Sequence, residues 1–124
     1  MILGIGSDII EISRVNLAIQ RQGQRFLDRL FSQEEQDYCH RHQESARHFS
    51  GRFAAKEATV KALGTGFREG ITWLDIVISN DHHGKPIVTL SPALQEMFHS
   101  PIILISISHC KEYAMAFATH TAAP

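Results

Sequence analysis

Two acidic residues and one lysine are the side chains whose types and spacing could do chemistry together. Glu57 and Lys61 are four residues apart in a predicted helix, so they would stack on one of its faces. Asp8 lies in a separate predicted strand, on the same face as Gly4 and Gly6. Two carboxylates brought together repel each other, and a hard divalent cation removes that conflict. The set therefore favours Mg²⁺ held by Asp8 and Glu57, with Lys61 beside the phosphates of a substrate.

The helix that would position Glu57 and Lys61 is predicted over residues 49–66. The pair lies in the strip between two apolar flanks, and the solvated side is expected around Arg52 and Thr59. Charged groups held between packing surfaces lose hydration and need a partner. In the simpler alternative the two satisfy only each other, as an ion pair worth about 0.2–0.5 kcal/mol. One flank is small and the other bulky: Gly51, Ala54, Ala55, Ala58 and Ala62 against Phe49, Phe53, Val60 and Leu63.

A glycine-rich turn is predicted to close this helix. Gly64, Thr65 and Gly66 lie one turn beyond Lys61, where successive N–H groups could form an anion nest. The alternative for Gly64 is an ordinary helix C-cap. The glycines follow a helix, so this is not the dinucleotide fingerprint, which follows a strand. A metal, a lysine and a glycine-rich turn together suit a pyrophosphate.

The segment after the first strand carries regularly spaced arginines. Ser13 can cap a helix that runs to residue 22 and stops at Gly23, and a second helical piece covers residues 25–30. If the two pieces form one helix in phase, the arginines share a stripe that could dock an acidic partner. The alternative is an ordinary solvated face. The residues of the stripe are Arg14, Arg21, Arg25 and Arg29.

The remaining patterns predict an α+β fold with a mostly antiparallel sheet packed against the long central helix. Ser32 and Glu35 form a capping box that starts a helix to about residue 42. In that helix, Cys39, His40 and His42 lack a second ligand pair with zinc-site spacing, so we expect surface residues. Strands are predicted over 2–12, 71–79, 86–90, 102–108 and 113–120, with a helix over 92–99 and hairpin turns at 80–85 and 109–112.

Composition narrows the class of protein. A chain of 124 residues, 44% hydrophobic and 20% charged, is expected to form one globular domain over residues 1–124. The net charge of −1 argues against a nucleic-acid binder. Two distant cysteines give no disulfide framework, which fits a reducing compartment. No signal peptide and no membrane-spanning apolar run is evident, so we expect a cytoplasmic protein without a membrane partner.

Several segments carry a resemblance to a known enzyme family. They are GIGSDIIEISRV at 4–15, FAAKEATVKALGTG at 53–66, the Gly84-Lys85-Pro86 turn, and SISH at 106–109 with the following Tyr113 and Ala114. These segments span the full length of the chain, and the KEA-centred motif is highly specific. The sequence resembles the holo-[acyl-carrier-protein] synthases, the short single-domain branch of the 4′-phosphopantetheinyl transferases.

The resemblance implies transfer of the phosphopantetheine arm of coenzyme A to a serine of apo acyl carrier protein. Adenosine 3′,5′-bisphosphate would be the other product, and the pathway would be fatty acid and lipid biosynthesis. By position, Asp8 and Glu57 match the family's Mg²⁺ ligands, and Lys61 matches its motif lysine at the pyrophosphate. The resemblance also implies a homotrimer with active sites between subunits.

The same resemblance implies two further sets of binding residues. Arg14 matches the arginine that meets the acidic helix of the carrier, with Arg21 and Arg25 as companions. The coenzyme A site would take Lys61 together with Arg52, Gly64, Thr65, Gly66, Pro86 and His109.

The mechanism suggested by these parts is an in-line attack of the serine hydroxyl on phosphorus, with Mg²⁺ neutralising developing charge. Lys61 would stabilise the departing phosphate oxygen. The base is left open between Glu57 and a hydroxide on the metal. Two other functions stay open: a metal-dependent hydrolase of nucleotide pyrophosphates, and a non-catalytic module that binds an acidic helix.

Overall fold

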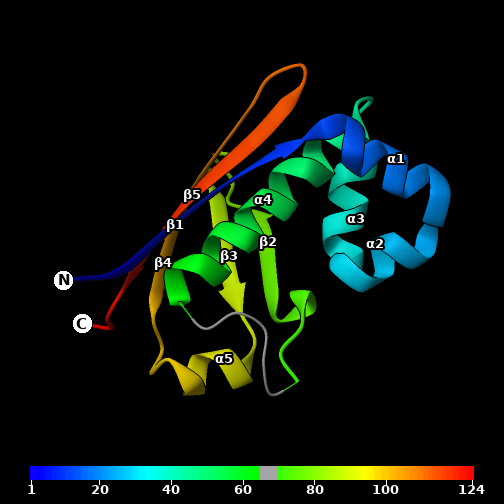
Figure 1. The fold of residues 1–124 in the computed structure, drawn as a ribbon. Helices are drawn as coiled ribbons and strands as arrows, with labels where there is room; N and C mark the ends of the chain where they lie inside the picture. The colour runs from blue at the N-terminus through cyan, green and yellow to red at the C-terminus, as the bar shows by residue number, and fades with distance from the viewer. Residues whose placement is uncertain (65–69) are drawn as a thin grey trace.

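One long helix, α4 (Ser45–Leu63), lies at the centre of the molecule and packs against strands of two antiparallel sheets (Figure 1). The computed structural model describes residues 1–64 and 70–124. The fold is α+β, as predicted. The other elements are β1 (Ile2–Glu11), α1 (Ile12–Gln22), α2 (Gln24–Leu30), α3 (Gln33–His40), the 3₁₀ turn η1 (Trp73–Asp75), β2 (Ile76–Asn80), β3 (Pro86–Leu90), α5 (Pro92–Met97), β4 (Ile102–His109) and β5 (Tyr113–Thr121).

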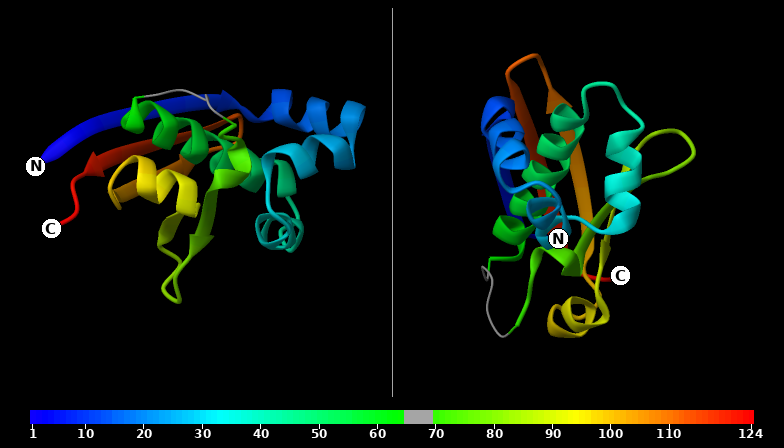
Figure 2. Two further views of the ribbon diagram at one scale, coloured as in Figure 1. Left: turned by 90° about the horizontal axis from the view of Figure 1, so that it is seen from below. Right: turned by 90° about the vertical axis from the view of Figure 1, so that its right-hand side faces the viewer.

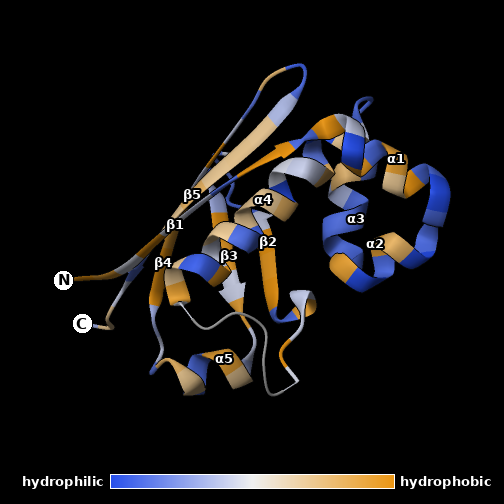
Figure 3. Ribbon diagram, in the orientation of Figure 1, coloured by the Kyte–Doolittle hydropathy of each residue, from blue (hydrophilic) through white to orange (hydrophobic). Residues whose placement is uncertain are grey.

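The larger sheet has the order β1-β5-β4, so the first strand of the chain pairs with the last. Helix α4 lies along one face of this sheet (Figure 2). β5 alternates between buried alanines on that face and exposed larger residues on the other. Apolar residues recur along all three strands (Figure 3). The outer face therefore exposes a set of large apolar side chains: Ile5, Ile9, Leu104, Met115 and Phe117.

Glycines let β1 and α4 approach each other backbone to backbone. A Cβ added to Gly4 would collide with the carbonyl oxygen of Ala62, and one added to Gly6 would collide with that of Ala58. This confirms that the Gly4–Gly6–Asp8 face of β1 has room for a bulky neighbour, which is the helix itself. Close approach fixes the position of α4 along β1, and with it the residues that α4 brings near Asp8.

The central helix begins at Ser45, four residues before the predicted start. The prediction began at the first apolar residue, Phe49, but the helix has an additional polar turn. In that turn Arg47 forms an ion pair of 2.8 Å with Glu44, so charge rather than apolar periodicity supports the first turn.

Two further boundaries differ from the prediction. The segment 71–79 is strand only from Ile76, because a capped 3₁₀ turn precedes it. There the Thr72 hydroxyl accepts from the N–H of Leu74, and the Thr72 N–H donates to Asp75 at 2.7 Å. Ser13 does not cap α1: the helix follows β1 directly, with Glu11 at the N-cap position.

The arginine stripe is not one continuous helix. Gly23 has φ 59° and ψ −135°, which ends α1 and starts α2 in a new direction. All four arginines are exposed. They would share one stripe only if residues 12–30 formed a single helix, and they do not.

The prediction that α4 is solvated around Arg52 and Thr59 is also wrong. Arg52 is 4% exposed and Thr59 is 0% exposed, because α1, α3, β2 and the large sheet all pack around this helix. Thr59 satisfies its hydroxyl on the carbonyl of Ala55 at 2.8 Å. Cys39, expected at the surface, is fully buried with Phe49 in the core between α3 and α4.

Candidate functional site

Asp8 and Glu57 meet at the junction of β1 and α4. Both line a cavity of about 390 Å³, whose wall also includes Arg14, Phe53 and Tyr113. The Oδ2 atom of Asp8 is buried and has no hydrogen-bond partner among the described residues. A buried carboxylate oxygen without a donor is costly, so this oxygen is suited to a ligand that the protein chain does not supply.

Burial and the proximity of Asp8 change the pKa of Glu57. Its pKa is raised to about 7, first by burial and then by the adjacent Asp8 carboxyl, which approaches within hydrogen-bonding range; Lys61 acts in the opposite direction. Two carboxyls this close do not readily ionise together. Glu57 therefore holds its proton more readily than an ordinary glutamate, and a cation bound by the two carboxyls would displace that proton.

Lys61 completes the group from the next turn of α4. Its Nζ lies 3.2 Å from Asp8 Oδ1 and donates to the carbonyl of Ser7 at 3.0 Å. Among the ion pairs of the described residues, Lys61 pairs with Asp8 and not with Glu57. The simple alternative of a self-satisfied Glu57–Lys61 pair is therefore wrong. The lysine side chain is 55% exposed, so it remains accessible to a ligand.

The donor set of this site fits a hard cation. Asp8 and Glu57 offer carboxylate oxygens, and no cluster of three or more His, Cys, Asp or Glu side chains with metal-site geometry occurs in residues 1–64 and 70–124. Mg²⁺ commonly takes one or two protein carboxylates and completes its shell with water and substrate phosphates. The orphaned Oδ2 of Asp8 is the observation that supports this fit.

A second cavity, of about 190 Å³, brings together three residues expected at a coenzyme A site. Arg52, Pro86 and His109 line it, and they come from α4, β3 and β4. His48 and Asn80 complete the polar part of the wall.

Arg52 is a buried cation without a carboxylate partner among the described ion pairs. Its guanidinium stacks on the ring of Tyr38 at 3.8 Å, and its Nη2 donates to Asn80 Oδ1 at 2.6 Å. Its Nε is buried and has no hydrogen-bond partner within residues 1–64 and 70–124. A fixed guanidinium with free donor capacity is suited to an anionic group such as a phosphate.

Within one chain, the residues predicted to bind coenzyme A do not all lie together. Lys61 and Gly64 lie nine and twelve residues beyond Arg52 on α4, which is about 14 and 18 Å at the helical rise. Gly64 has φ 82°, and its N–H bonds to the carbonyl of Val60 at 2.9 Å, as expected for a C-cap. Thr65 and Gly66 lie outside the described residues.

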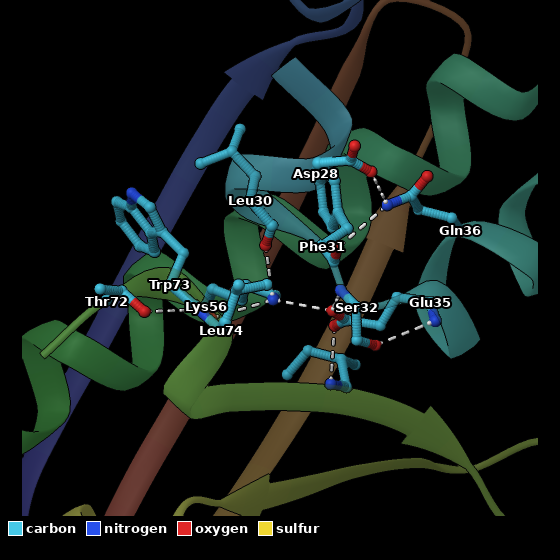
Figure 4. Close-up of polar contacts among 11 residues, drawn as sticks. Asp28, Leu30, Phe31, Ser32, Glu35, Gln36, Lys56, Thr72, Trp73 and Leu74 are labelled. Atoms are coloured by element: carbon cyan, nitrogen blue, oxygen red, sulfur yellow. Dashed lines mark hydrogen bonds and ion pairs between the residues drawn. The ribbon is translucent and has the colours of Figure 1, made fainter. Parts of the chain in front are cut away.

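Sequence reasoning missed a buried ion pair next to the site. Lys56, the residue before Glu57, donates to Glu35 at 2.8 Å and to the carbonyls of Leu30 and Trp73 at 2.7 and 3.1 Å (Figure 4). Both charged side chains are 0% exposed. Glu35 also accepts from the N–H of Ile78 at 2.9 Å. The pair ties α4 to α2, α3, η1 and β2.

A sequence signal for this pair existed. At the helical rotation of about 100° per residue, Lys56 falls among Phe49, Val60 and Leu63 on the bulky apolar flank of α4, which predicts burial, and a buried lysine requires an acid. Glu35 was recognised only as a capping-box residue, and that part is confirmed by bonds in both directions with Ser32.

The three predicted carrier-binding arginines are exposed, and they differ in position. Arg14 lines the same cavity as Asp8 and Glu57, and its nearest acid is Glu11 at 3.6 Å. Arg21 and Arg25 lie farther along, at the end of α1 and the start of α2.

No helix of the described residues is long and apolar enough to cross a bilayer.

Comparison with known proteins gives a consistent result. The family model of the 4′-phosphopantetheinyl transferase superfamily matches residues 4–118. A holo-[acyl-carrier-protein] synthase of Protochlamydia amoebophila is 60% identical over 118 residues, covering 95% of this chain and 97% of that protein.

Solved structures are similar over nearly the whole chain. The crystal structure of holo-[acyl-carrier-protein] synthase from Neisseria meningitidis superposes with a TM-score of 0.88 at 32% identity, covering 97% of this chain and 98% of that one. The Helicobacter pylori synthase, in complex with coenzyme A, gives a TM-score of 0.86 at 33% identity, covering 94% and 99%.

Proposed function

Because this chain belongs to the holo-[acyl-carrier-protein] synthases of the 4′-phosphopantetheinyl transferase superfamily, we propose that it transfers the 4′-phosphopantetheine group of coenzyme A to a serine of apo acyl carrier protein. Adenosine 3′,5′-bisphosphate is the second product. The observation that carries the proposal is that Asp8 and Glu57 line one cavity while Lys61 forms an ion pair with Asp8.

Asp8 and Glu57 are the proposed ligands of Mg²⁺. The orphaned Oδ2 of Asp8 and the raised pKa of Glu57, about 7, both support a cation between the two carboxyls. When bound, Mg²⁺ supplies neutralisation of the pyrophosphate charge and of charge developing at the transferred phosphorus.

The residues of the chain have separate roles in the transfer. Lys61 holds a positive charge against the departing phosphate oxygen, and its bond to the Ser7 carbonyl directs the ammonium towards the carboxylates. Glu57, half-buried at the cavity wall, can accept the proton of the attacking serine hydroxyl. The leaving group is a weak base, so charge stabilisation matters more than proton donation to it.

Coenzyme A is proposed to contact Arg52, Pro86 and His109 at one end, and Lys61, Gly64, Thr65 and Gly66 at the other. The Nε of Arg52, buried without a hydrogen-bond partner among the described residues, supports an anionic group of the nucleotide at the first end.

A homotrimer with active sites between subunits accounts for two observations. The two ends of the proposed coenzyme A site lie about 14 Å apart or more along α4 of one chain. The outer face of the large sheet exposes the apolar side chains of Ile5, Leu104 and Phe117. A patch of this kind marks an interaction surface. We propose that identical subunits cover it and that each site takes its two ends from neighbouring chains.

Arg14, Arg21 and Arg25 are the proposed contacts of the acidic carrier. Arg14 supports this assignment best, because it lines the cavity of the two carboxylates and leads the carrier serine to the site.

The experiment is a mass measurement of apo acyl carrier protein after incubation with coenzyme A and Mg²⁺. The expected result is an increase by one phosphopantetheine group that requires both additions. A parallel sample without carrier tests for hydrolysis of coenzyme A. Product release there, with no mass increase of the carrier, would replace the transferase by a pyrophosphate hydrolase.

A further inference from the structure

Three histidines gather beside Arg52 at the second cavity. The rings of His42 and His48 stack with their centroids 3.8 Å apart and their planes 19° apart. His109 meets His48 edge-on at 5.4 Å. His48 and His109 line the cavity together with Arg52. None of the assignments above uses His42 or His48.

The charged surroundings of His48 are mainly positive. On α4 its neighbours are Arg47 and Arg52; His42 lies before the helix, and His109 at the end of β4. Tyr38 of α3 approaches at 6.0 Å. On the β2–β3 side the wall is formed by Asn80, Gly84 and Pro86, which carry no ionisable side chain.

Acidic side chains near this cluster are engaged or line another cavity. Glu44 is paired with Arg47 at 2.8 Å. Glu34 and Asp81 line the adjoining cavity of about 440 Å³ with Arg41 and His42, and neither lines the cavity of His48. Among the described residues, the wall of the 190 Å³ cavity therefore has one permanent cation, Arg52, and no carboxylate, although Arg52 also lines the adjoining cavity.

His48 stays neutral near pH 7 until an anion arrives. Burial, followed by the charges of His42, His109, Arg52 and Arg47, lowers the pKa of His48 to about 4. A phosphate group in the cavity would reverse the sign of the local field and favour the imidazolium. His42 lies against the same ring, and a positive charge on it would oppose protonation of His48.

We propose that His48, backed by His42, is an additional anion-binding residue of the Arg52–His109 cavity and takes up a proton when a phosphate group of the nucleotide enters. This inference rests on the proposed coenzyme A site. If His48 has this role, the nucleotide binds more tightly as pH falls through the neutral range. The reason is that His48 becomes a cation on binding only by taking up a proton, which is more available at lower pH.

The test is isothermal titration calorimetry of the full chain with adenosine 3′,5′-bisphosphate at pH 6.5, 7.5 and 8.5. Each titration is run in two buffers of different ionisation enthalpy, so that the number of protons taken up is measured. His48→Phe keeps a ring against His42 but cannot bind a proton. The phosphate groups titrate too, so the quantity of interest is the difference in proton number between the two proteins.

At pH 6.5 and 7.5 the unsubstituted protein should take up more protons on binding than His48→Phe, by up to about one proton. His48→Phe should bind the bisphosphate roughly tenfold more weakly at pH 6.5 and with nearly unchanged affinity at pH 8.5. His83→Phe, in the exposed β2–β3 turn and outside the cavity, is the matched control and should behave as the unsubstituted protein.

Equal proton numbers for the unsubstituted protein and His48→Phe at every pH would overturn the inference. The carrier mass assay at saturating coenzyme A separates this failure from failure of the proposed function. A protein that modifies its carrier but shows equal proton numbers loses only the role of His48. A protein that neither binds the bisphosphate nor modifies the carrier loses both.

Discussion

The ammonium group of Lys56 lies 2.8 Å from the carboxylate of Glu35, and neither side chain is exposed to solvent. Lys56→Met leaves the Glu35 charge buried and unpaired. We expect a loss of about 3–5 kcal/mol in the free energy of unfolding, which urea denaturation measures. Since Lys56 also donates to the carbonyls of Leu30 and Trp73, part of this loss reflects those two hydrogen bonds.

The double variant Glu35→Leu/Lys56→Met separates charge from packing. Removing both charges should recover part of the stability lost in Lys56→Met, because no isolated ion remains. A double variant less stable than Lys56→Met would show that the hydrogen bonds to the backbone, and not the ion pair, determine the cost.

Lys61→Ala should lower the rate of carrier modification by about 10²–10³-fold, the range seen when one donor to a developing oxyanion is removed. The side chain is 55% exposed, so the fold should be unaffected. The measurement is kcat with saturating coenzyme A and carrier, beside a thermal melt. Near-normal turnover would contradict the role assigned to Lys61.

Because the pKa of Glu57 is raised to about 7, the Mg²⁺ concentration that the enzyme needs should depend on pH. Below pH 7 the cation must displace a proton, so the Mg²⁺ concentration for half-maximal activity should fall by up to tenfold per unit as pH rises towards 7, and should level off above it. Without Mg²⁺ the same group makes the fold less stable as pH rises from about 4.5 to 7, because the folded state then binds more protons than the unfolded one.

Glu57→Gln tests that assignment. It should lose Mg²⁺-dependent stabilisation in thermal melts with coenzyme A, and without Mg²⁺ it should be less sensitive to pH between 4.5 and 7. A Mg²⁺ response unchanged by the substitution would place the cation elsewhere.

Arg14→Glu should raise the Michaelis constant for the carrier by roughly tenfold or more, with a much smaller change for coenzyme A. The reason is its exposed position on the cavity of Asp8 and Glu57. Arg29→Glu, an equal change of charge on α2 away from this cavity, is the control. Equal effects of the two variants on carrier binding would mean a general charge effect and not a docking contact.

Gly6→Ala should disturb the proposed metal site without changing either of its proposed ligands. The added Cβ would collide with the carbonyl oxygen of Ala58, which follows Glu57 on α4. We expect a stability loss of about 1–3 kcal/mol and a weaker Mg²⁺ response, measured by thermal melts with and without the cation. Ser7→Ala, the neighbour on the exposed side of β1, is the control and should change neither. If Gly6→Ala behaves like Ser7→Ala, close backbone packing is not what aligns the two carboxylates.

The elements of this fold were predictable where local chemistry decides them. The Ser32–Glu35 capping box, Gly23, Gly64 and the hairpin turns act within a few residues, and the structure has them as the sequence indicates. The meeting of Asp8 with Glu57 was also foreseeable, because the glycines of β1 required a close neighbour.

What the sequence did not predict depends on how elements pack. Arg52 and Thr59 follow the helical pattern of a solvated side, but α4 is enclosed by both sheets and two helices, so that side does not exist. Lys56 beside Glu57 reads as one polar patch, although the helical rotation of about 100° sends the two side chains to different partners. The His42–His48 contact joins a loop to a helix, which no periodicity reports.

The pairing of β1 with β5 also constrains how the protein is made. When Asp8 leaves the ribosome, its partner in the ladder, Ala116, has not yet been synthesised. At a translation rate of about 5–20 residues per second, the interval between the synthesis of the two residues is roughly 5–20 s. During that time the isoleucine-rich first strand has no edge of its own sheet to bind, so the nascent chain depends on helical contacts or on chaperones until its final hairpin emerges.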